Sequence, residues 1–299
     1  MGRTANPAAA RSVAPGSVES SDPAPRPILK WVGGKTQLLE QMKPLMPKTW
    51  NRYFEPFVGG AAVFFELRAQ RPEMPAFLSD VNAELVNCYT VVRDDVDAVI
   101  EALRQHVYES EHYYKVRALN PAELAPAARA ARTIFLNKTG YNGLYRVNRS
   151  GQFNVPFGRF TKPLFCDVDN LHACARALRG VSIEHDDFSK VLERAKKGDF
   201  VYFDPPYVPL SPTSDFTAYI PGGFGEAEQR KLAKVFAKLA ARGVHVMLSN
   251  SDTPLVRELY DGFDIHVVYA SRSVNSNAAR RGKLAEVVVR SSGRSKRSS

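Results

Sequence analysis

The alternation of apolar and polar positions along the chain predicts strands and helices that follow one another in turn. Seven short apolar runs have the length and composition of buried strands. They lie within residues 52–58, 75–82, 181–188, 199–204, 244–252, 263–270 and 284–290. Apolar positions at helical spacing predict helices over about residues 37–46, 61–69, 83–107 and 226–243. Strands that alternate with helices are typical of an α/β sheet.

The middle of the chain breaks this rhythm. The pattern predicts that residues 93–135 are wholly helical, whereas residues 137–163 are dense in Gly, Asn, Arg and aromatic side chains and indicate a loop or hairpin. We therefore expect a domain over residues 84–168, inserted between two parts of one α/β domain, 27–83 and 169–290. The composition of residues 1–26 and 291–299 predicts disordered tails.

The charge of the chain favours a polyanionic partner. The net charge is +10, so nucleic acid is the first candidate and an anionic membrane surface the second. A solvated basic surface without a partner is the alternative. No apolar run approaches the roughly 18 residues of a membrane span. Three cysteines without a Cys-x-x-Cys pair argue against a disulfide framework and a structural zinc site, and favour a cytoplasmic location.

The first glycine turn is close to the end of a nucleotide-triphosphate loop. It contains Gly33, Gly34, Lys35 and Thr36, and such a loop needs a further Gly five positions before the last one, after a strong apolar strand. Leu29 occupies that position, and the preceding apolar run is very short. An NTPase is therefore disfavoured, and this turn must serve another ligand.

The second glycine turn lies between an expected strand and an expected helix. Gly59 and Gly60 would let the backbone approach a ligand at the end of the first strand. Asp80 ends the next strand, near the spacing of about 20 residues at which an acid binds a ribose. Together these residues favour an adenosine-containing cofactor over a simple tight turn.

The strongest feature is the sequence Asp204-Pro205-Pro206-Tyr207, which follows an apolar strand. The prolines fix the backbone and lack amide donors, so carbonyls are left as acceptors. A carboxylate, a fixed carbonyl and an aromatic face can hold a planar group that carries an NH₂. The alternative is a proline-rich strand end with a capping Asp, which the apolar run before it disfavours.

This motif resembles the catalytic motif of amino-group DNA methyltransferases, and the chain resembles the DNA adenine methyltransferase (Dam) family in particular. The similar stretches follow the family's own order: residues 29–39, 53–67, 78–89, 136–163, 203–219 and 272–289. They cover the cofactor segment, glycine turn, ribose-binding strand end, recognition hairpin, catalytic motif and C-terminal segment. Ala61 stands where family members often carry Gly, and we expect only a minor adjustment there.

The resemblance implies a Rossmann-like sheet that binds S-adenosylmethionine, with an inserted, mainly helical target-recognition domain that carries a β-hairpin loop. It implies N6-methylation of an adenine flipped out of duplex DNA, with GATC as the leading site. A metal-free monomer of bacterial or phage origin is expected. Restriction–modification and DNA replication or repair are the family's settings.

The resemblance also assigns roles to individual residues. Catalysis falls to Asp204, Pro205, Pro206 and Tyr207, with adenine N6 donating hydrogen bonds to Asp204 and to the Pro205 carbonyl. The residues expected to bind the cofactor are Trp31, Lys35, Glu55, Phe57, Gly59, Asp80, Asp187, Phe188 and Asp204. Those expected at DNA are Lys30, Tyr141, Asn142, Leu144, Arg146, Pro156, Arg159, Arg280 and Arg281. Tyr141 is expected to insert where the base left, and Arg146 to contact a guanine edge.

Two other classes stay open at this point. One is methylation of a different planar amino group, on an RNA base or a protein glutamine. Protein-glutamine enzymes usually carry Asn at the position of Asp204 and need no basic hairpin. The other is a DNA-binding relative without activity, which the intact motif and cofactor set disfavour.

Overall fold

The computed structural model describes residues 23–31, 33–148, 150–209, 223–271 and 283–291. Its strands are β1 (Tyr53–Glu55), β2 (Ala76–Asp80), β3 (Ser182–His185), β4 (Phe200–Phe203), β5 (His245–Ser251), β6 (Asp264–Ser271) and β7 (Lys283–Arg290). Its α-helices are α1 (Leu39–Met42), α2 (Ala62–Gln70), α3 (Ala83–Asp94), α4 (Val96–Arg104), α5 (Ser110–Ala118), α6 (Pro126–Thr139), α7 (Val168–Leu178), α8 (Val191–Arg194), α9 (Glu226–Ala241) and α10 (Pro254–Leu259). Short 3₁₀ turns are η1 (Lys35–Gln37), η2 (Lys43–Leu45), η3 (Pro121–Glu123), η4 (Tyr141–Gly143) and η5 (Phe188–Lys190).

The strands form one seven-stranded sheet in the order β3-β2-β1-β4-β5-β7-β6. The pairs from β3 to β5 are parallel, and β7 runs antiparallel to both β5 and β6. This confirms the expected α/β class. The chain moves outward from β1 in one direction through β2 and β3, and in the other from β4. The order therefore reverses between β1 and β4, and open α/β sheets bind ligands beyond the carboxyl ends of strands at such a point.

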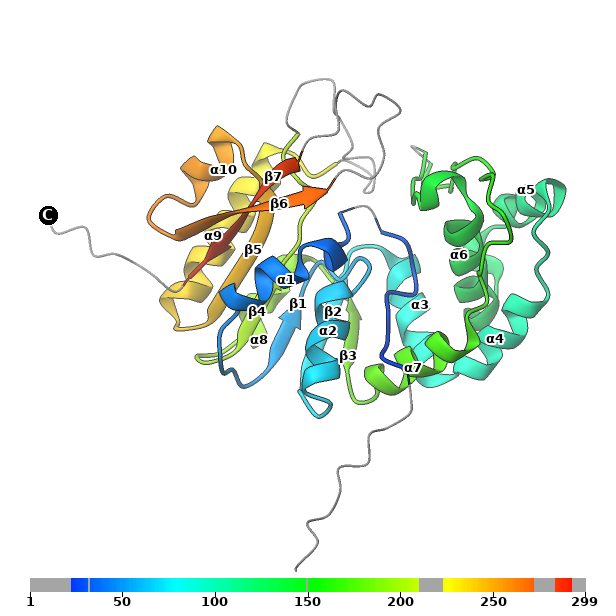
Figure 1. Cartoon of the computed structure of the whole chain (residues 1–299), viewed down its shortest axis with the longest axis horizontal. Coiled ribbons are helices and arrows are strands. Elements are labelled where there is room, and N and C mark those ends of the chain that lie inside the picture. The colour runs from blue at the N-terminus through cyan, green and yellow to red at the C-terminus, as the bar shows by residue number, and fades with distance from the viewer. Residues whose placement is uncertain (1–22, 32, 149, 210–222, 272–282, 292–299) are drawn as a thin grey trace, which may run out of the picture.

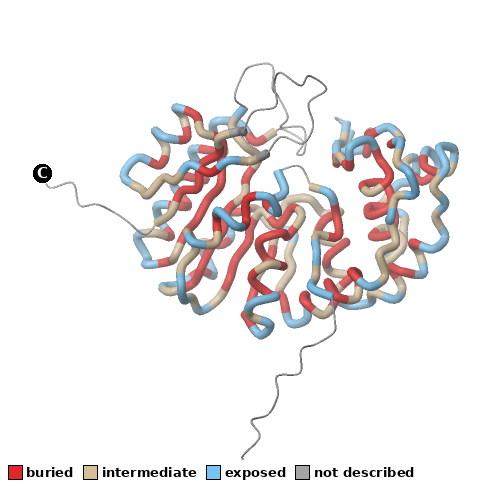
Figure 2. The backbone as a smooth tube through the Cα atoms, in the orientation of Figure 1, coloured by how far each residue is buried: buried red, intermediate tan, exposed pale blue. Residues whose placement is uncertain are grey.

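Both faces of the sheet are covered by apolar side chains. Strand β4 shows the alternation directly. Phe200 and Tyr202 join the hydrophobic cluster on one face, and Val201 and Phe203 join the cluster on the other. Successive side chains of a strand point to opposite faces, so a run of four apolar residues is what a strand covered on both sides requires. Figure 2 shows the buried backbone concentrated in the central strands and in the helices that cover them.

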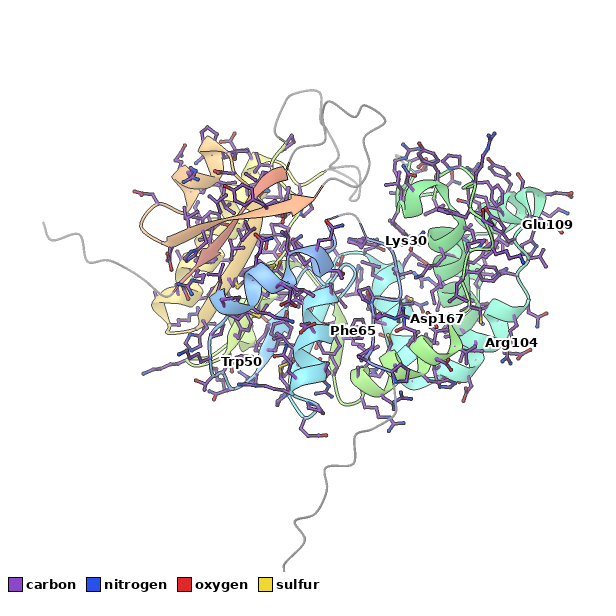
Figure 3. The ribbon with its side chains drawn as sticks, in the orientation of Figure 1. Lys30, Trp50, Phe65, Arg104, Glu109 and Asp167 are labelled. Carbon is purple, nitrogen blue, oxygen red and sulfur yellow. The ribbon has the colours of Figure 1, made fainter. Side chains whose placement is uncertain are left out.

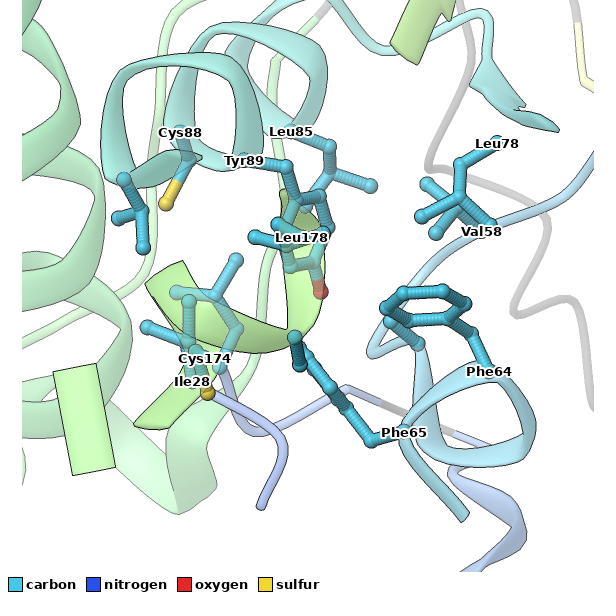
Figure 4. Close-up of a cluster of buried hydrophobic side chains, with 14 of the residues drawn as sticks. Ile28, Val58, Phe64, Phe65, Leu78, Leu85, Cys88, Tyr89, Cys174 and Leu178 are labelled. Atoms are coloured by element: carbon cyan, nitrogen blue, oxygen red, sulfur yellow. The ribbon is translucent and has the colours of Figure 1, made fainter. Parts of the chain in front are cut away.

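The first cluster extends beyond the sheet into the middle of the chain. Figure 4 shows Phe64 and Phe65 of α2 near Tyr89 of α3 and Cys174 of α7. The same cluster includes Phe135 of α6. Figure 1 shows α4, α5 and α6 grouped at the opposite end of the molecule from β5, β6 and β7. The middle section thus packs directly on the helices beside the sheet, and the expected boundaries at 84 and 168 stay predictions.

The prediction of a wholly helical stretch over residues 93–135 is wrong, because this region contains α4, α5 and α6 with breaks between them. Asp95 ends α3 and caps α4, since its side chain accepts the amide of Ala98 at 3.1 Å. Asn120 caps the next turn in the same way, and Pro121 and Pro126 lack the amide that a helix interior needs. Side-chain caps therefore begin α4 and η3, and prolines begin η3 and α6, so the stretch is divided into separate helices.

The stretch expected as a loop or hairpin is organised by two antiparallel bridges, Gly140 with Phe157 and Val147 with Phe153. No helix among the described residues is long and apolar enough to cross a membrane.

Candidate active site

The motif expected to be catalytic, residues 204–207, lies where the order of the sheet reverses. In the register of the two central strands, Tyr53 of β1 is opposite Phe200 of β4 and Phe54 is opposite Val201. Glu55 ends β1, and Asp204 follows the last residue of β4 directly. The two carboxyl side chains therefore lie at the same edge of the sheet.

Asp204 is held by a buried lysine. The Lys35 Nζ atom lies 2.8 Å from Asp204 Oδ1, and the Asp204 side chain is 21% exposed while that of Lys35 is 2% exposed. Burial raises the pKa of Asp204 to about 6, although the neighbouring Lys35 charge opposes this effect. Asp204 is therefore mostly ionised at neutral pH, so both of its oxygens are available as hydrogen-bond acceptors. Lys35 also lies 4.8 Å from the centre of the Tyr207 ring.

The backbone after Asp204 is fixed by buried amides. Gln229 of α9 donates through Nε2 to the Pro206 carbonyl at 2.8 Å, and Asn250 of β5 donates to Gln229 Oε1 at 3.1 Å. Asn250 Oδ1 in turn accepts the amide of Val208 at 3.1 Å. Because Gln229 uses the Pro206 carbonyl, the Pro205 carbonyl is the one expected to receive the substrate amino group.

The hydroxyl end of Tyr207 is anchored to β7, which lies two strands from β4 in the sheet. Its hydroxyl donates to Glu286 Oε2 on β7 at 2.7 Å, and Glu286 is buried. No role was expected from the sequence for Gln229, Asn250 or Glu286. For Glu286 the only local signal is a charged residue directly before the apolar Val-Val-Val of its strand.

Glu55 is mostly protonated at pH 7. Burial raises its pKa to about 8, and the Asp204 charge adds to that effect while the hydrogen bond from Tyr53 opposes it. The Tyr53 hydroxyl donates to Glu55 Oε2 at 2.8 Å. Glu55 therefore lines the edge of the sheet as a carboxylic acid rather than as a second negative charge.

The second glycine turn joins β1 to the acidic end of β2. Asp80 Oδ2 accepts the amide of Gly59 at 3.2 Å, and Oδ1 accepts that of Asn82 at 2.9 Å. Burial raises the pKa of Asp80 to about 6 against these hydrogen bonds. Gly59 has φ of +44°, and a Cβ there would lie 2.8 Å from the Trp31 ring. The two glycine turns of the sequence are therefore in contact through Trp31.

Ala61 adopts the left-handed conformation, with φ of 56° and ψ of 28°, at the start of α2. This conformation costs a residue with a Cβ about 1 kcal/mol. Ala61 therefore holds this turn at the expense of local backbone strain, and the minor adjustment expected at this position stays a prediction.

Aromatic side chains form one wall near this turn. The rings of Phe57 and Phe188 stack with centroids 5.3 Å apart, and Phe224 contacts both edge-on. Asp187, beside Phe188, accepts from Lys231 Nζ at 2.9 Å. Burial acts to raise the pKa of Asp187, but hydrogen bonds from Ser189 and Lys231 outweigh it and lower the pKa.

The residues expected at DNA gather around one turn and hairpin. Tyr141 and Asn142 are exposed in η4, and Tyr141 is 53% exposed. Arg146 is exposed and donates through Nε to Asn154 Oδ1 at 2.8 Å. Lys30 lies 4.4 Å above the centre of the Phe160 ring; Figure 3 labels its place on the N-terminal segment. The remaining members are exposed at Pro156 and Arg159 and partly buried at Leu144, while Arg280 and Arg281 lie outside the described residues.

Comparison with known proteins agrees with this geometry. The chain matches the family described as D12 class N6 adenine-specific DNA methyltransferase over residues 31–274. A type II methyltransferase of Lactococcus lactis subsp. cremoris is 43% identical over 272 residues, which cover 88% of this chain and 94% of that protein. A type II methyltransferase of Methanocaldococcus jannaschii is 43% identical, with 86% and 95% covered. The DNA adenine methylase of Escherichia coli strain K12 is 38% identical, with 88% and 94% covered.

The sheet, its switch point and the Asp-Pro-Pro-Tyr sequence at that edge define a methyltransferase that acts on an amino group. The chain belongs to the D12 class of N6 adenine-specific DNA methyltransferases. Its substrate is DNA and its methyl donor is S-adenosylmethionine. The expected family, enzymatic activity and methyl donor are confirmed.

The residues that follow or end β1, β2 and β3 fit this cofactor. The partly exposed Asp80 carboxylate suits ribose hydroxyls, and the Phe57–Phe188 pair offers a flat apolar surface. No group of three or more His, Cys, Asp and Glu side chains within the described residues is arranged to hold a metal ion.

Proposed function

We propose that this enzyme methylates N6 of the adenine in GATC after turning the base out of the duplex, with Asp204 as the central catalytic residue. The observation that carries the proposal is the fixed arrangement at the end of β4. Asp204 is mostly ionised beside Lys35, Tyr207 is anchored by Glu286, and the backbone between them is held by Gln229.

In this mechanism the chain holds the amino group and localises its lone pair. Adenine N6 is a weak nucleophile because its lone pair is delocalised into the ring. Its two N–H groups donate to Asp204 and to the Pro205 carbonyl, and the ring stacks on Tyr207. These acceptors stabilise the positive charge that develops on N6, and orientation of the two reactants supplies much of the remaining acceleration.

S-Adenosylmethionine, when bound, supplies a methyl group whose bond to sulfur breaks as the bond to N6 forms. The residues proposed to hold it are Asp80 at the ribose, Gly59 and Trp31 at the turn, Phe57, Phe188 and Asp187 at the aromatic wall, and Glu55 and Lys35 beside Asp204. Asp204 then takes the proton that N6 loses and passes it to solvent.

The target base must leave the stack because its N6 cannot be reached inside a duplex, which costs a few kcal/mol. The exposure of Tyr141 supports base flipping, because an exposed aromatic ring in the hairpin can fill the space that the base leaves. The proposed target-recognition region is residues 84–168, with the hairpin over residues 137–163 as the part that contacts the bases.

GATC rests on the resemblance of this hairpin to that of the Dam family. A different site is the second candidate, since the two type II methyltransferases are more similar to this chain than the E. coli DNA adenine methylase is. Arg280 and Arg281 are proposed as backbone contacts.

Mapping of N6-methyladenine by long-read sequencing tests the proposal. DNA from cells that express the protein is compared with DNA from cells that express Asp204→Ala. Methylation of GATC adenines with the wild type alone is expected. Methylation confined to another sequence would refute GATC, and unchanged methylation with Asp204→Ala would refute the catalytic assignment.

A further inference from the structure

Two buried asparagines grip the N-terminal segment in the same way. Asn137 of α6 accepts the amide of Lys30 through Oδ1 at 2.7 Å and donates to the Lys30 carbonyl through Nδ2 at 2.8 Å. Asn170 of α7 accepts the amide of Arg26 at 2.8 Å and donates to its carbonyl at 3.0 Å. Each side chain thus satisfies both the N–H and the carbonyl of one residue of the segment, as a neighbouring β-strand would do.

Asn137 makes one contact that Asn170 lacks. Its Nδ2 atom also donates to the carbonyl of Gly143 at 3.0 Å, and the Asn137 side chain is fully buried. Gly143 ends the η4 turn that carries Tyr141 and Asn142. One amide therefore holds the N-terminal segment and the turn with the expected DNA contacts at the same time.

Gly143 packs directly against the Lys30 side chain, with no room for a Cβ atom. Gly143 has φ of +63°, and a Cβ built on it would collide with the side chain of Lys30, whose own Cβ would be 2.8 Å away. The turn thus lies directly on the N-terminal segment, and only a glycine fits both the conformation and the space.

The segment continues from Asn137's contact straight into the proposed cofactor site. Trp31 follows Lys30 and packs on Gly59, and its ring centre lies 5.2 Å from that of Tyr145 in the hairpin. Four residues further, Lys35 is paired with Asp204. The segment therefore contacts the glycine turn, the catalytic carboxylate and the hairpin within six residues.

We propose that Asn137 is a positioning residue that couples cofactor binding to DNA binding; this rests on the roles given above to the segment and the turn. Both N–H donors and the oxygen of the Asn137 side chain are already in hydrogen bonds. If the N-terminal segment moved and Asn137 moved with it, the bond to the Gly143 carbonyl would break and a buried polar group would be left unpaired. A ligand that orders one element therefore orders the other. Such coupling is reciprocal, and the affinity of each ligand rises when the other is bound.

The test compares Asn137→Ala with Asn170→Ala in the full chain. The affinity for S-adenosylhomocysteine, which binds without turnover, is measured by calorimetry with and without the duplex found by methylation mapping. We expect DNA to tighten this binding at least about fivefold in the wild type, in the usual range of coupling between sites, and to do so equally in Asn170→Ala. In Asn137→Ala the ratio of the two affinities for S-adenosylhomocysteine, with DNA and without it, should fall to near one.

Three results would overturn the proposal: no coupling in the wild type, an unchanged ratio in Asn137→Ala, or the same loss in both variants. Thermal unfolding of both variants shows whether they are folded. If Asn137→Ala is not, Gly143→Ala disturbs the same joint from the turn and should also remove the coupling; retention of the wild-type ratio would overturn it. The ratio needs no turnover, so a failure of the proposed catalytic roles would appear separately, in the methylation assay.

Discussion

Replacing Lys35 by Met should shift the pH dependence of methyl transfer toward higher pH. In the proposed mechanism Asp204 must be ionised to stabilise the positive charge on N6 and to take its proton, and its pKa is about 6 with Lys35 beside it. Burial raises that pKa, and the Lys35 charge at 2.8 Å acts in the opposite direction. Met fills a similar volume without the charge, so the substitution leaves the burial of Asp204 and removes the opposing effect.

The size of the shift follows from the geometry. An opposite charge at close range lowers the pKa of a carboxylic acid by about 1 to 3, so Lys35→Met should raise the pKa of Asp204 to between about 7 and about 9. At a pKa of about 8, the ionised fraction at pH 7 falls from about nine-tenths to about one-tenth. Activity is lost when Asp204 is protonated, that is, as pH falls through the pKa of Asp204. Because this pKa is higher in Lys35→Met, the variant loses activity at a higher pH than the wild type does.

The assay is transfer of a labelled methyl group to duplex DNA between pH 5 and pH 9.5, at cofactor and DNA concentrations that saturate each variant. Saturation separates this effect from any loss of cofactor affinity, since Lys35 is also proposed at that site. The wild type should lose activity below about pH 6, and Lys35→Met should recover much of its activity above pH 8. Asp204→Asn serves as the control, with low activity at every pH. An acidic limit that stays near pH 6 in Lys35→Met would refute the role given to the ion pair.

Three further substitutions test other parts of the site. Glu286→Ala leaves the Tyr207 hydroxyl without its partner, which costs about 1–3 kcal/mol; methyl transfer should fall by about tenfold, with recovery in Glu286→Gln, and equal rates in Ala and Gln variants would contradict the anchoring role. Arg146→Ala should reduce discrimination at one base pair by about 1–3 kcal/mol; a uniform loss of affinity for all sequences would show a phosphate contact instead. Glu55→Gln should gain stability relative to the wild type as pH rises from about 5 to about 8, by about 1.4 kcal/mol per pH unit. The reason is that the folded state keeps Glu55 protonated up to a pKa of about 8; urea unfolding that shows a constant difference across this range would refute it.

The sequence by itself determined the elements and the motifs at their ends. An apolar run of four before Asp204 favours a strand covered on both faces, and the glycine turn before α2 permits a close approach of the backbone. Both are local properties, because the periodicity of side chains and the freedom of φ depend on near neighbours. The family resemblance rests on the same local stretches, which is why the enzymatic activity and methyl donor could be predicted from them.

Local composition failed where a side chain competed with the helix. Residues 93–135 have helix-forming composition, yet Asp95 and Asn120 cap new helices. Both residue types favour caps over helix interiors, and the choice is decided by which neighbouring elements the helices meet.

Only the tertiary structure decided the partners that fix the site. Glu286 is 79 residues from Tyr207, and Asn137 is 107 residues from Lys30. Such pairs depend on the order and register of strands and on how helices pack, and nothing in either local stretch specifies the other. The sequence thus supplied the carboxylate, the turns and the aromatic rings. The fold decided that Lys35 lies beside Asp204, that Glu286 holds the Tyr207 hydroxyl, and that Asn137 joins Lys30 to the hairpin. These contacts form only when the chain has folded.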